Sequence, residues 1–234
     1  MPYIPDPTCQ IPVLGPLLEG LLGFRHKGTF VEVGAFDGQT FSNTSFLADL
    51  GWHGVYVEPV PHFAAACAAR HAANPNINVV QCAVGPDDTI ITLELRGPLT
   101  TADSAMAQAY DQIVWAPAMA QISGQVITPE SAQNGDSITV PQRRLEDILG
   151  ETGVPLGFDL LVVDVEGGED GVFASFDLAL WRPKVVIVEL EDAHPSMTAF
   201  PEITVRARAV RERILAAGYR EVYRDNVNTV FAAP

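Results

Sequence analysis

One short segment of the chain has the residue types of a nucleoside-binding turn. FVEVGAFDGQT, residues 30–40, is an apolar run that passes into Gly34 and Asp37. In a second run, VYVEP, the apolar residues are followed by Glu58, about 20 residues after Asp37. In a βαβ unit the glycines let the backbone of the turn approach a ligand, and an acid at this interval binds ribose hydroxyls. We therefore expect a nucleoside-containing ligand here.

The same turn argues against a dinucleotide. Phe36 stands where a dinucleotide fold has its middle glycine, and Asp37 would face the pyrophosphate. A carboxylate repels phosphates but attracts an ammonium or a sulfonium group. The residues thus favour S-adenosylmethionine over NAD. The alternative is a tight turn between a strand and a helix that binds no ligand, since isolated glycine motifs are weak signals.

A second acidic segment, DVEGGED at 164–170, follows the apolar run that begins at Phe158. Ligands of open α/β sheets bind at the carboxyl ends of the strands, which is where Asp164 is expected. Methyl transfer to a hydroxyl group needs a base beside that hydroxyl. Glu166 is the first candidate for this base, and His194 is the second. The alternatives are a carboxylate that caps a helix and a histidine in a surface loop.

Five segments carry a resemblance to one protein family. They are VEVGAFDGQTFSNTSFL, GVYVEP, AVG at 83–85, VPQRRLEDIL at 140–149 and LLVVDVEGGEDGVF at 160–173. These segments resemble the FkbM-type S-adenosylmethionine-dependent methyltransferases. The resemblance runs from about residue 29 to residue 191 and is interrupted at 97–137. Its most specific part is the D-x-E-G-x-E element that starts at Asp164.

The resemblance implies a cofactor site built from the ends of successive strands. Gly34, Ala35 and Asp37 would line the methionine end of S-adenosylmethionine, and Glu32 would support the loop. Glu58 would bind the ribose hydroxyls. The other cofactor-binding residues that it implies are Phe36, Gly38, Pro59, Ala83, Val84, Asp164 and Val165. The family methylates mainly hydroxyl oxygens, so the resemblance implies O-methylation of a sugar or small metabolite.

Mg²⁺ is a further candidate cofactor. Some related O-methyltransferases hold Mg²⁺ with carboxylates at strand ends, and here Asp164, Glu191 and Asp192 occupy comparable positions. Oxygen ligands of this kind suit Mg²⁺, and the ion would lower the pKa of a bound hydroxyl. The alternative is that no metal binds, because FkbM-type proteins are not generally assigned one. In that case Glu189 and Glu191 belong to a strand whose end is in solvent.

Composition excludes other classes of protein. With a net charge of −15 and only 14 Lys and Arg residues, the chain is a poor partner for nucleic acid. Cys9, Cys67 and Cys82 lie far apart, which predicts free thiols in a reducing compartment. No signal peptide and no apolar run of about 18 residues is visible, so we expect a cytoplasmic protein that does not span a membrane. The expected partner is a small-molecule or glycan acceptor.

Strands alternate with helices along most of the chain, which predicts an α/β fold with a mainly parallel sheet, and the resemblance implies the Rossmann-like, class I methyltransferase type. The predicted strands are 29–33, 54–58, 76–84, 89–95, 138–142, 158–166 and 184–191, and the predicted helices are 14–24, 39–51, 61–73, 144–151, 168–176 and 202–217. Two extended runs that flank Asp225–Asn226 predict a terminal antiparallel hairpin. Together they predict a seven-stranded, mainly parallel sheet with helices on both faces.

The chain is expected to divide into an arm with a short helix, residues 1–28, and a methyltransferase domain, residues 29–234. Within the domain, residues 97–137 break the alternation and read as an insert or lid, helical at 103–115 and with a turn at 133–137. Its residues Tyr110, Trp115 and Met119 are candidates for a substrate lid, or for contacts that only hold the insert to the core. Near the first turn, Ser42 and Asn43 either cap a helix or touch the cofactor.

Two other functions remain open on the sequence. One is an NAD(P)-linked oxidoreductase on a Rossmann sheet, against which Phe36 and Asp37 argue. The other is a non-catalytic nucleoside-binding module of the same fold. Retention of Gly34, Asp37, Glu58 and the D-x-E-G-x-E element argues against a chain that has lost turnover.

Overall fold

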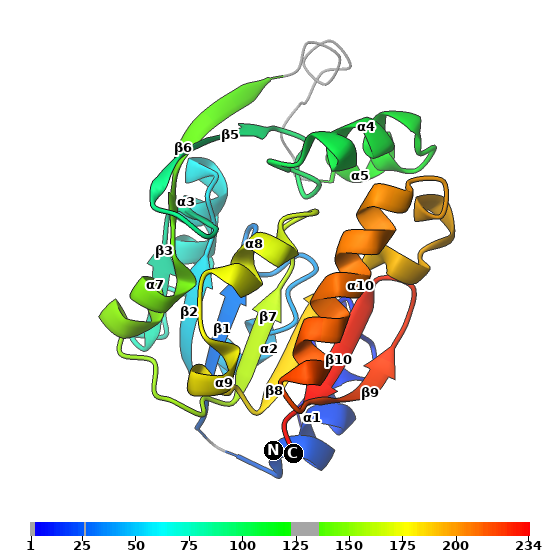
Figure 1. The fold of residues 1–234 in the computed structure, drawn as a ribbon. Coiled ribbons are helices and arrows are strands. Elements are labelled where there is room, and N and C mark those ends of the chain that lie inside the picture. The colour runs from blue at the N-terminus through cyan, green and yellow to red at the C-terminus, as the bar shows by residue number, and fades with distance from the viewer. Residues whose placement is uncertain (1–2, 26, 123–135) are drawn as a thin grey trace.

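The computed structural model describes residues 3–25, 27–122 and 136–234, and a seven-stranded sheet forms its centre (Figure 1). The strands are β1 (Thr29–Val33), β2 (His53–Val57), β3 (Ile77–Val80), β7 (Leu160–Val163), β8 (Val185–Glu189), β9 (Arg220–Arg224) and β10 (Asn228–Ala232). Their order is β3-β2-β1-β7-β8-β10-β9. Only the pairings of β10 with β8 and with β9 are antiparallel. The predicted mainly parallel sheet with a terminal antiparallel hairpin is therefore confirmed.

Helices cover both faces of this sheet (Figure 1). On one face lie α7 (Leu145–Glu151), α8 (Glu169–Ala174), α9 (Leu178–Trp181) and α10 (Pro201–Ala216), and on the other lie α1 (Leu14–Leu22), α2 (Ser45–Asp49) and α3 (Pro61–Arg70). Successive residues of a strand point to opposite faces. In β7, Leu161 packs in the first layer and Leu160 in the second, so the whole strand is apolar.

The predicted helix at 39–51 is shorter than expected, because α2 begins only at Ser45. The residues before it use their backbone N–H groups differently. Thr40 N–H donates to the Asp37 carboxylate, and Asn43 N–H donates to the Glu32 carboxylate. Side-chain acceptors of this kind compete with helical hydrogen bonding. The segment therefore forms a hydrogen-bonded loop at the end of β1 instead of the first turns of a helix.

The predicted strand at 76–84 divides into two. Cys82 N–H donates to the Val80 carbonyl, and this turn separates β3 from β4 (Ala83–Val84). β4 then joins β5 (Thr89–Glu94) and β6 (Ser137–Arg143) in a separate three-stranded sheet with the order β4-β6-β5. Sequence reasoning placed these runs in succession along one sheet and did not predict the second sheet. Both sheets contribute to the cavity described below.

Between β5 and β6 the described residues form two helices, α4 (Ser104–Gln112) and α5 (Ala116–Ala120). Met106 and Tyr110 of α4 pack with Met197, which precedes α10, and with Ile203 of α10. The predicted turn at 133–137 lies mostly outside the described residues. Among those that are described, no helix is both long and apolar enough to cross a membrane.

Gly34 is the point at which β1 and β7 come closest. Its φ is +86°, and a Cβ atom there would lie 1.6 Å from the backbone oxygen of Asp164. Asp164 N–H donates to the Val33 carbonyl at 3.0 Å and joins the ends of β1 and β7, while Gly34 N–H donates to the Val57 carbonyl of β2 at 2.9 Å. Only glycine fits here.

This geometry predicts a large loss of stability for Gly34→Ala. Gly153 serves as the matched control, because its φ is also positive, at +70°, but a Cβ atom there would meet nothing within 4 Å. Gly153→Ala should cost about 1–2 kcal/mol of backbone strain. Gly34→Ala should lower the free energy of unfolding by about 2 kcal/mol more, as measured by urea denaturation, because the clash is added to the strain. Equal losses in the two variants would contradict the close contact.

Candidate active site

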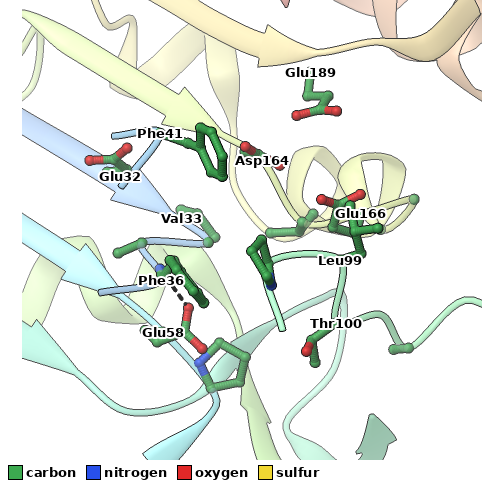
Figure 2. A pocket seen from close by; sticks show the side chains of 18 of the residues that line it. Glu32, Val33, Phe36, Phe41, Glu58, Leu99, Thr100, Asp164, Glu166 and Glu189 are labelled. Carbon is green, nitrogen blue, oxygen red and sulfur yellow. Dashed lines mark hydrogen bonds between the residues drawn. The ribbon is translucent and has the colours of Figure 1, made fainter. Parts of the chain in front are cut away.

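A cavity of about 900 Å³ opens at the carboxyl ends of β1, β2, β7 and β8. This is the edge of a parallel sheet where ligands bind. Residues from other parts of the chain complete its walls, among them Pro7 to Gln10 of the N-terminal arm, Leu99 and Tyr110 of the segment after β5, and His194 beyond β8. Figure 2 shows that Asp164, Glu166 and Glu189 lie on one side of the cavity and Glu58 on another.

Glu58 follows β2 and is only 5% exposed. Phe36 N–H donates to one carboxylate oxygen at 2.8 Å, and Val60 N–H donates to the other at 2.8 Å. Burial raises the pKa of Glu58 to about 7, although both backbone hydrogen bonds act to lower it. A carboxylate oxygen has room for a second donor. Glu58 is thus a fixed pair of acceptors at the cavity wall, suited to two adjacent hydroxyl groups.

Glu32 supports the loop that follows β1. Ser42 Oγ donates to its carboxylate at 2.8 Å, Thr44 Oγ1 donates to the same oxygen, and Asn43 N–H donates to the other at 3.2 Å. Burial raises the pKa of Glu32 to about 7, and these hydrogen bonds oppose the rise. Ser42 Oγ also accepts from Thr44 N–H and Ser45 N–H, at the start of α2. Ser42 therefore connects the buried acid to the helix.

Asp37 lies in the turn that follows β1. Its carboxylate accepts from Gln39 N–H at 2.9 Å and from both the N–H and the hydroxyl of Thr40 at 2.7 Å. Neither Asp37 nor Gly38 lines the cavity. The Gly38 carbonyl contacts His71 Nε2 at 2.8 Å. Both residues shape the turn, while Gly34, Ala35 and Phe36 face the cavity, so the expected contact of Asp37 and Gly38 with a cofactor stays a prediction.

An apolar wall lies beside Glu58. Phe36, at φ +48°, packs against Phe63 with ring centroids 4.2 Å apart. Ala83 and Leu93 join the same apolar cluster. Pro59 and Val84, which the sequence also predicted, line the cavity next to this wall. The wall offers a flat apolar surface to a planar ring.

Three carboxylates meet where β7 and β8 end. Asp164, Glu166 and Glu189 each offer one oxygen, and these three oxygens lie within 4.8 Å of one another. Burial raises the pKa of all three carboxyls, and in Glu166 and Glu189 the charges of the neighbouring carboxylates raise it further. Sequence reasoning singled out Asp164 and Glu166 but left Glu189 at a strand end in solvent, whereas the structure places it in the cavity wall.

The segment after β5 holds Glu166 in place. Glu166 has a φ of +53°, a left-handed conformation that is uncommon outside glycine. Thr101 Oγ1 donates to its backbone carbonyl at 2.6 Å, and the buried Tyr110 hydroxyl donates to its carboxylate. Tyr110 thus does more than fix the insert to the core. A second residue holds the neighbouring Asp164: Gln10 Nε2 donates to its carboxylate at 3.2 Å, a contact that nothing in the sequence indicates.

Asp192 is not available as a metal ligand. Arg211 and Arg224 pair with its carboxylate at 2.8 Å and 3.0 Å, and Asp192 does not line the cavity. The oxygens that lie close enough to share one ion belong to Asp164, Glu166 and Glu189, whereas the predicted candidates were Asp164, Glu191 and Asp192. Glu191, the first residue of a short 3₁₀ helix (Glu191–Ala193), is buried and lines the cavity close to this group.

His194, the second predicted base, also lines the cavity. Its Nδ1 accepts from Ser196 N–H at 3.2 Å, and its ring lies edge-on to Trp115 with centroids 5.8 Å apart. Burial lowers the pKa of His194, which favours the neutral imidazole. The structure thus brings both predicted bases to one cavity.

Comparison with known proteins gives one match to a family. The family model of the methyltransferase FkbM domain matches residues 32–221. Comparison with curated protein sequences finds no match.

Several solved structures are similar to the chain at low sequence identity. The O-methyltransferase TomG from Streptomyces achromogenes, in complex with S-adenosylmethionine, is 16% identical with a TM-score of 0.47, over 97% of this chain and 82% of that one. An O-methyltransferase from Bacillus cereus, in complex with S-adenosylhomocysteine, is 14% identical with a TM-score of 0.46, over 97% and 84%. Fibrillarin from Aeropyrum pernix, with bound S-adenosylmethionine, is 13% identical with a TM-score of 0.45, over 92% and 72%.

From the burial of Glu32 we expect the free energy of unfolding to depend on pH. Its pKa is about 7 in the folded protein, against a usual value of 4.5, so the folded state holds the proton more tightly. The contribution of Glu32 to stability must then fall as the pH rises from about 4.5 to about 7. We expect the unfolding free energy of the wild type, relative to Glu32→Gln, to drop by up to about 3 kcal/mol over this interval.

Urea denaturation at pH 5 and pH 8 measures this difference. The exposed Glu212→Gln is the matched control and should track the wild type at both pH values. A gap between the wild type and Glu32→Gln that stays constant with pH would contradict the assigned protonation of Glu32.

Proposed function

The chain belongs to the FkbM methyltransferase family, and from this premise we propose that it transfers a methyl group from S-adenosylmethionine to a hydroxyl oxygen of a sugar or another small metabolite. Family membership makes the protein an S-adenosylmethionine-dependent methyltransferase and disfavours the NAD(P)-linked alternative. The observation that carries O-methylation is the Glu166 carboxylate, which lines the cavity and is held by the Tyr110 hydroxyl. The acceptor class and the role of each residue belong to the proposal.

The walls of the cavity suggest how the donor lies. Glu58 would accept from the two ribose hydroxyls, because both of its oxygens are fixed and partly free. The adenine would lie on the apolar wall that contains Phe36 and Ala83. The methionine part would follow Gly34 and Ala35, and the sulfonium would lie near Asp164, whose negative charge attracts it.

The reaction needs one proton acceptor. A lone pair of the acceptor oxygen attacks the methyl carbon, the new O–C bond forms as the S–C bond breaks, and the electron pair stays on sulfur to give S-adenosylhomocysteine. The hydroxyl proton passes to Glu166. The positive sulfonium favours the ionised form of a nearby carboxyl, so donor binding would help to ready Glu166 as a base. Orientation of donor and acceptor supplies further acceleration.

The cavity also bears on the acceptor. Its volume of about 900 Å³ lies near the upper end of the range for small-molecule sites, which leaves room for a donor and an acceptor together. The one arginine among the cavity-lining residues, Arg206, is paired with Asp103. Carboxylates dominate the charged lining, so the cavity favours neutral or cationic acceptors over phosphorylated ones.

Glu58→Gln should weaken cofactor binding. The carboxylate is the better acceptor for ribose hydroxyls, so its loss should raise the Kd for S-adenosylhomocysteine by about 10- to 100-fold in calorimetry at pH 8. Because the pKa of Glu58 is about 7, the wild-type Kd should also rise as the pH falls from 8 to 6, whereas the Kd of the variant should change less. Glu94→Gln, on the second sheet, is the control. An unchanged Kd in Glu58→Gln would remove this residue from the site.

Glu166→Gln should lower turnover and leave donor binding nearly intact. A general base contributes about 10²- to 10⁴-fold, so kcat with an acceptor found in a panel of sugars and metabolites should fall by that factor. The measurement is transfer of a radiolabelled methyl group, with the Kd for S-adenosylhomocysteine as the check on folding. Full kcat in Glu166→Gln together with a loss in His194→Gln would assign the base to His194. Binding of S-adenosylhomocysteine without transfer to any acceptor would favour a non-catalytic module.

A further inference from the structure

We propose that Asp164, Glu166 and Glu189 bind one divalent cation, Mg²⁺ or Mn²⁺, with Glu191 as a fourth carboxylate beside it. The inference deepens the proposed function and rests on it for its role in catalysis, because the cation would hold the oxygen that receives the methyl group. The ligand set differs from the one that the sequence predicted. It is argued below from geometry, charge and the surroundings of each carboxylate.

The geometry suits a single ion. Oxygens bonded to one Mg²⁺, Mn²⁺ or Ca²⁺ ion at about 2.0–2.6 Å lie no more than roughly 4–5 Å apart. One oxygen each from Asp164, Glu166 and Glu189 meets this limit, at 4.8 Å or less (Figure 2). Carboxylate-only sites favour these ions over softer metals. The register pairs Val163 with Val188, so Asp164 and Glu189 follow neighbouring positions on two parallel strands and are rigidly placed.

Charge balance also points to a cation. Two other buried acids in the described part of the chain have basic partners: Asp192 pairs with Arg211 and Arg224, and Asp159 pairs with Arg25 and Lys184. In the same described ranges, no salt bridge reaches the three carboxylates. An ammonium group would neutralise one of their three charges, whereas a divalent ion neutralises two. This difference favours the metal over an amine as the occupant.

Glu191 supplies an independent observation. It is 6% exposed and lines the same cavity, and its Oε2 atom has no hydrogen-bond partner among the described residues. A buried carboxylate oxygen without a partner costs free energy, and such groups are rare in folded proteins. Burial raises the pKa of Glu191, and the charges of Glu169 and Asp164 raise it further. A nearby cation, or a water bound to that cation, would satisfy this oxygen.

Two residues outside the group orient its members. Tyr110 donates to Glu166, and Gln10 donates to Asp164. Outer hydrogen bonds of this kind fix the carboxylates that bind a metal. The Gln10 side chain is held in turn, because its oxygen accepts from Asn43 at 3.2 Å. The ligand set is therefore preformed by contacts from the N-terminal arm and from α4.

Such an ion would define the acceptor more closely. A cation at this place would bind one or two hydroxyl oxygens of the acceptor and lower the pKa of the hydroxyl to be methylated. Glu166 would bind the ion through one oxygen and keep the other, next to Tyr110, for the proton. Acceptors with adjacent hydroxyls would then be preferred over acceptors with a single hydroxyl.

Direct binding of Mn²⁺ tests the proposal without an acceptor. The full chain is dialysed against a chelator and titrated with Mn²⁺, and free Mn²⁺ is followed by electron paramagnetic resonance. We expect one Mn²⁺ per chain, displaced by Mg²⁺. Glu189→Gln should weaken binding at least about 10-fold, and Glu191→Gln should weaken it in the same direction. The exposed Asp147→Asn removes the same charge from α7 and should bind Mn²⁺ like the wild type.

The Kd for S-adenosylhomocysteine shows whether Glu189→Gln is folded. No Mn²⁺ binding by the wild type, or equal binding by the wild type and a folded Glu189→Gln, would overturn the site. If methyl transfer proceeds unchanged in a chelator and no Mn²⁺ binds, the proposed function stands and the metal site falls. If Mn²⁺ binds as expected and no acceptor in the panel is methylated in Mg²⁺, the metal site stands and the proposed function fails.

Discussion

The contact between the ends of β1 and β7 sets the position of everything in the cavity. At Gly34 the two backbones come so close that there is no room for a side chain. On the β1 side of this contact, the loop turns away and is anchored on Glu32. On the β7 side, Asp164 emerges directly into the cavity. The loop after β1 and the acidic group are thus held at a fixed separation by a steric limit.

The buried acids of this protein fall into distinct electrostatic classes. Glu32 is stabilised by hydroxyl groups and a backbone N–H, and Glu58 by two backbone N–H groups. Glu169 accepts from two backbone N–H groups at the start of α8. Asp192 is neutralised by arginines. The carboxylates of Asp164, Glu166 and Glu189 have fewer such hydrogen bonds and no basic partner among the described residues. Of these buried acids, they are therefore the ones that a cationic ligand would stabilise most.

Much of the fold was predictable because it depends on local pattern. The unbroken apolar runs predict buried parallel strands, and the interval to Glu58 places an acid at the cavity. The turn-capping role of Asp37 was not predictable, because an acid that caps its own turn has the same sequence appearance as one that faces a ligand. Tyr110 was visible as a lid residue but not as a partner of Glu166, since that contact joins residues 56 positions apart. Side-chain partnerships of this range leave no periodic signal.

The N-terminal arm has a consequence for how the protein acquires its site during synthesis. Gln10 contacts Asp164 across 154 positions of sequence. The arm must therefore wait, without its final partners, until the segment around Asp164 has been synthesised. Contacts between distant positions form slowly because the chain entropy of closing the loop opposes them. The central strands can pair before the arm closes over them, so the cavity is completed at the end of folding. A nascent chain that leaves the ribosome before the arm has closed would have the sheet but would lack the part of the cavity wall that the arm forms.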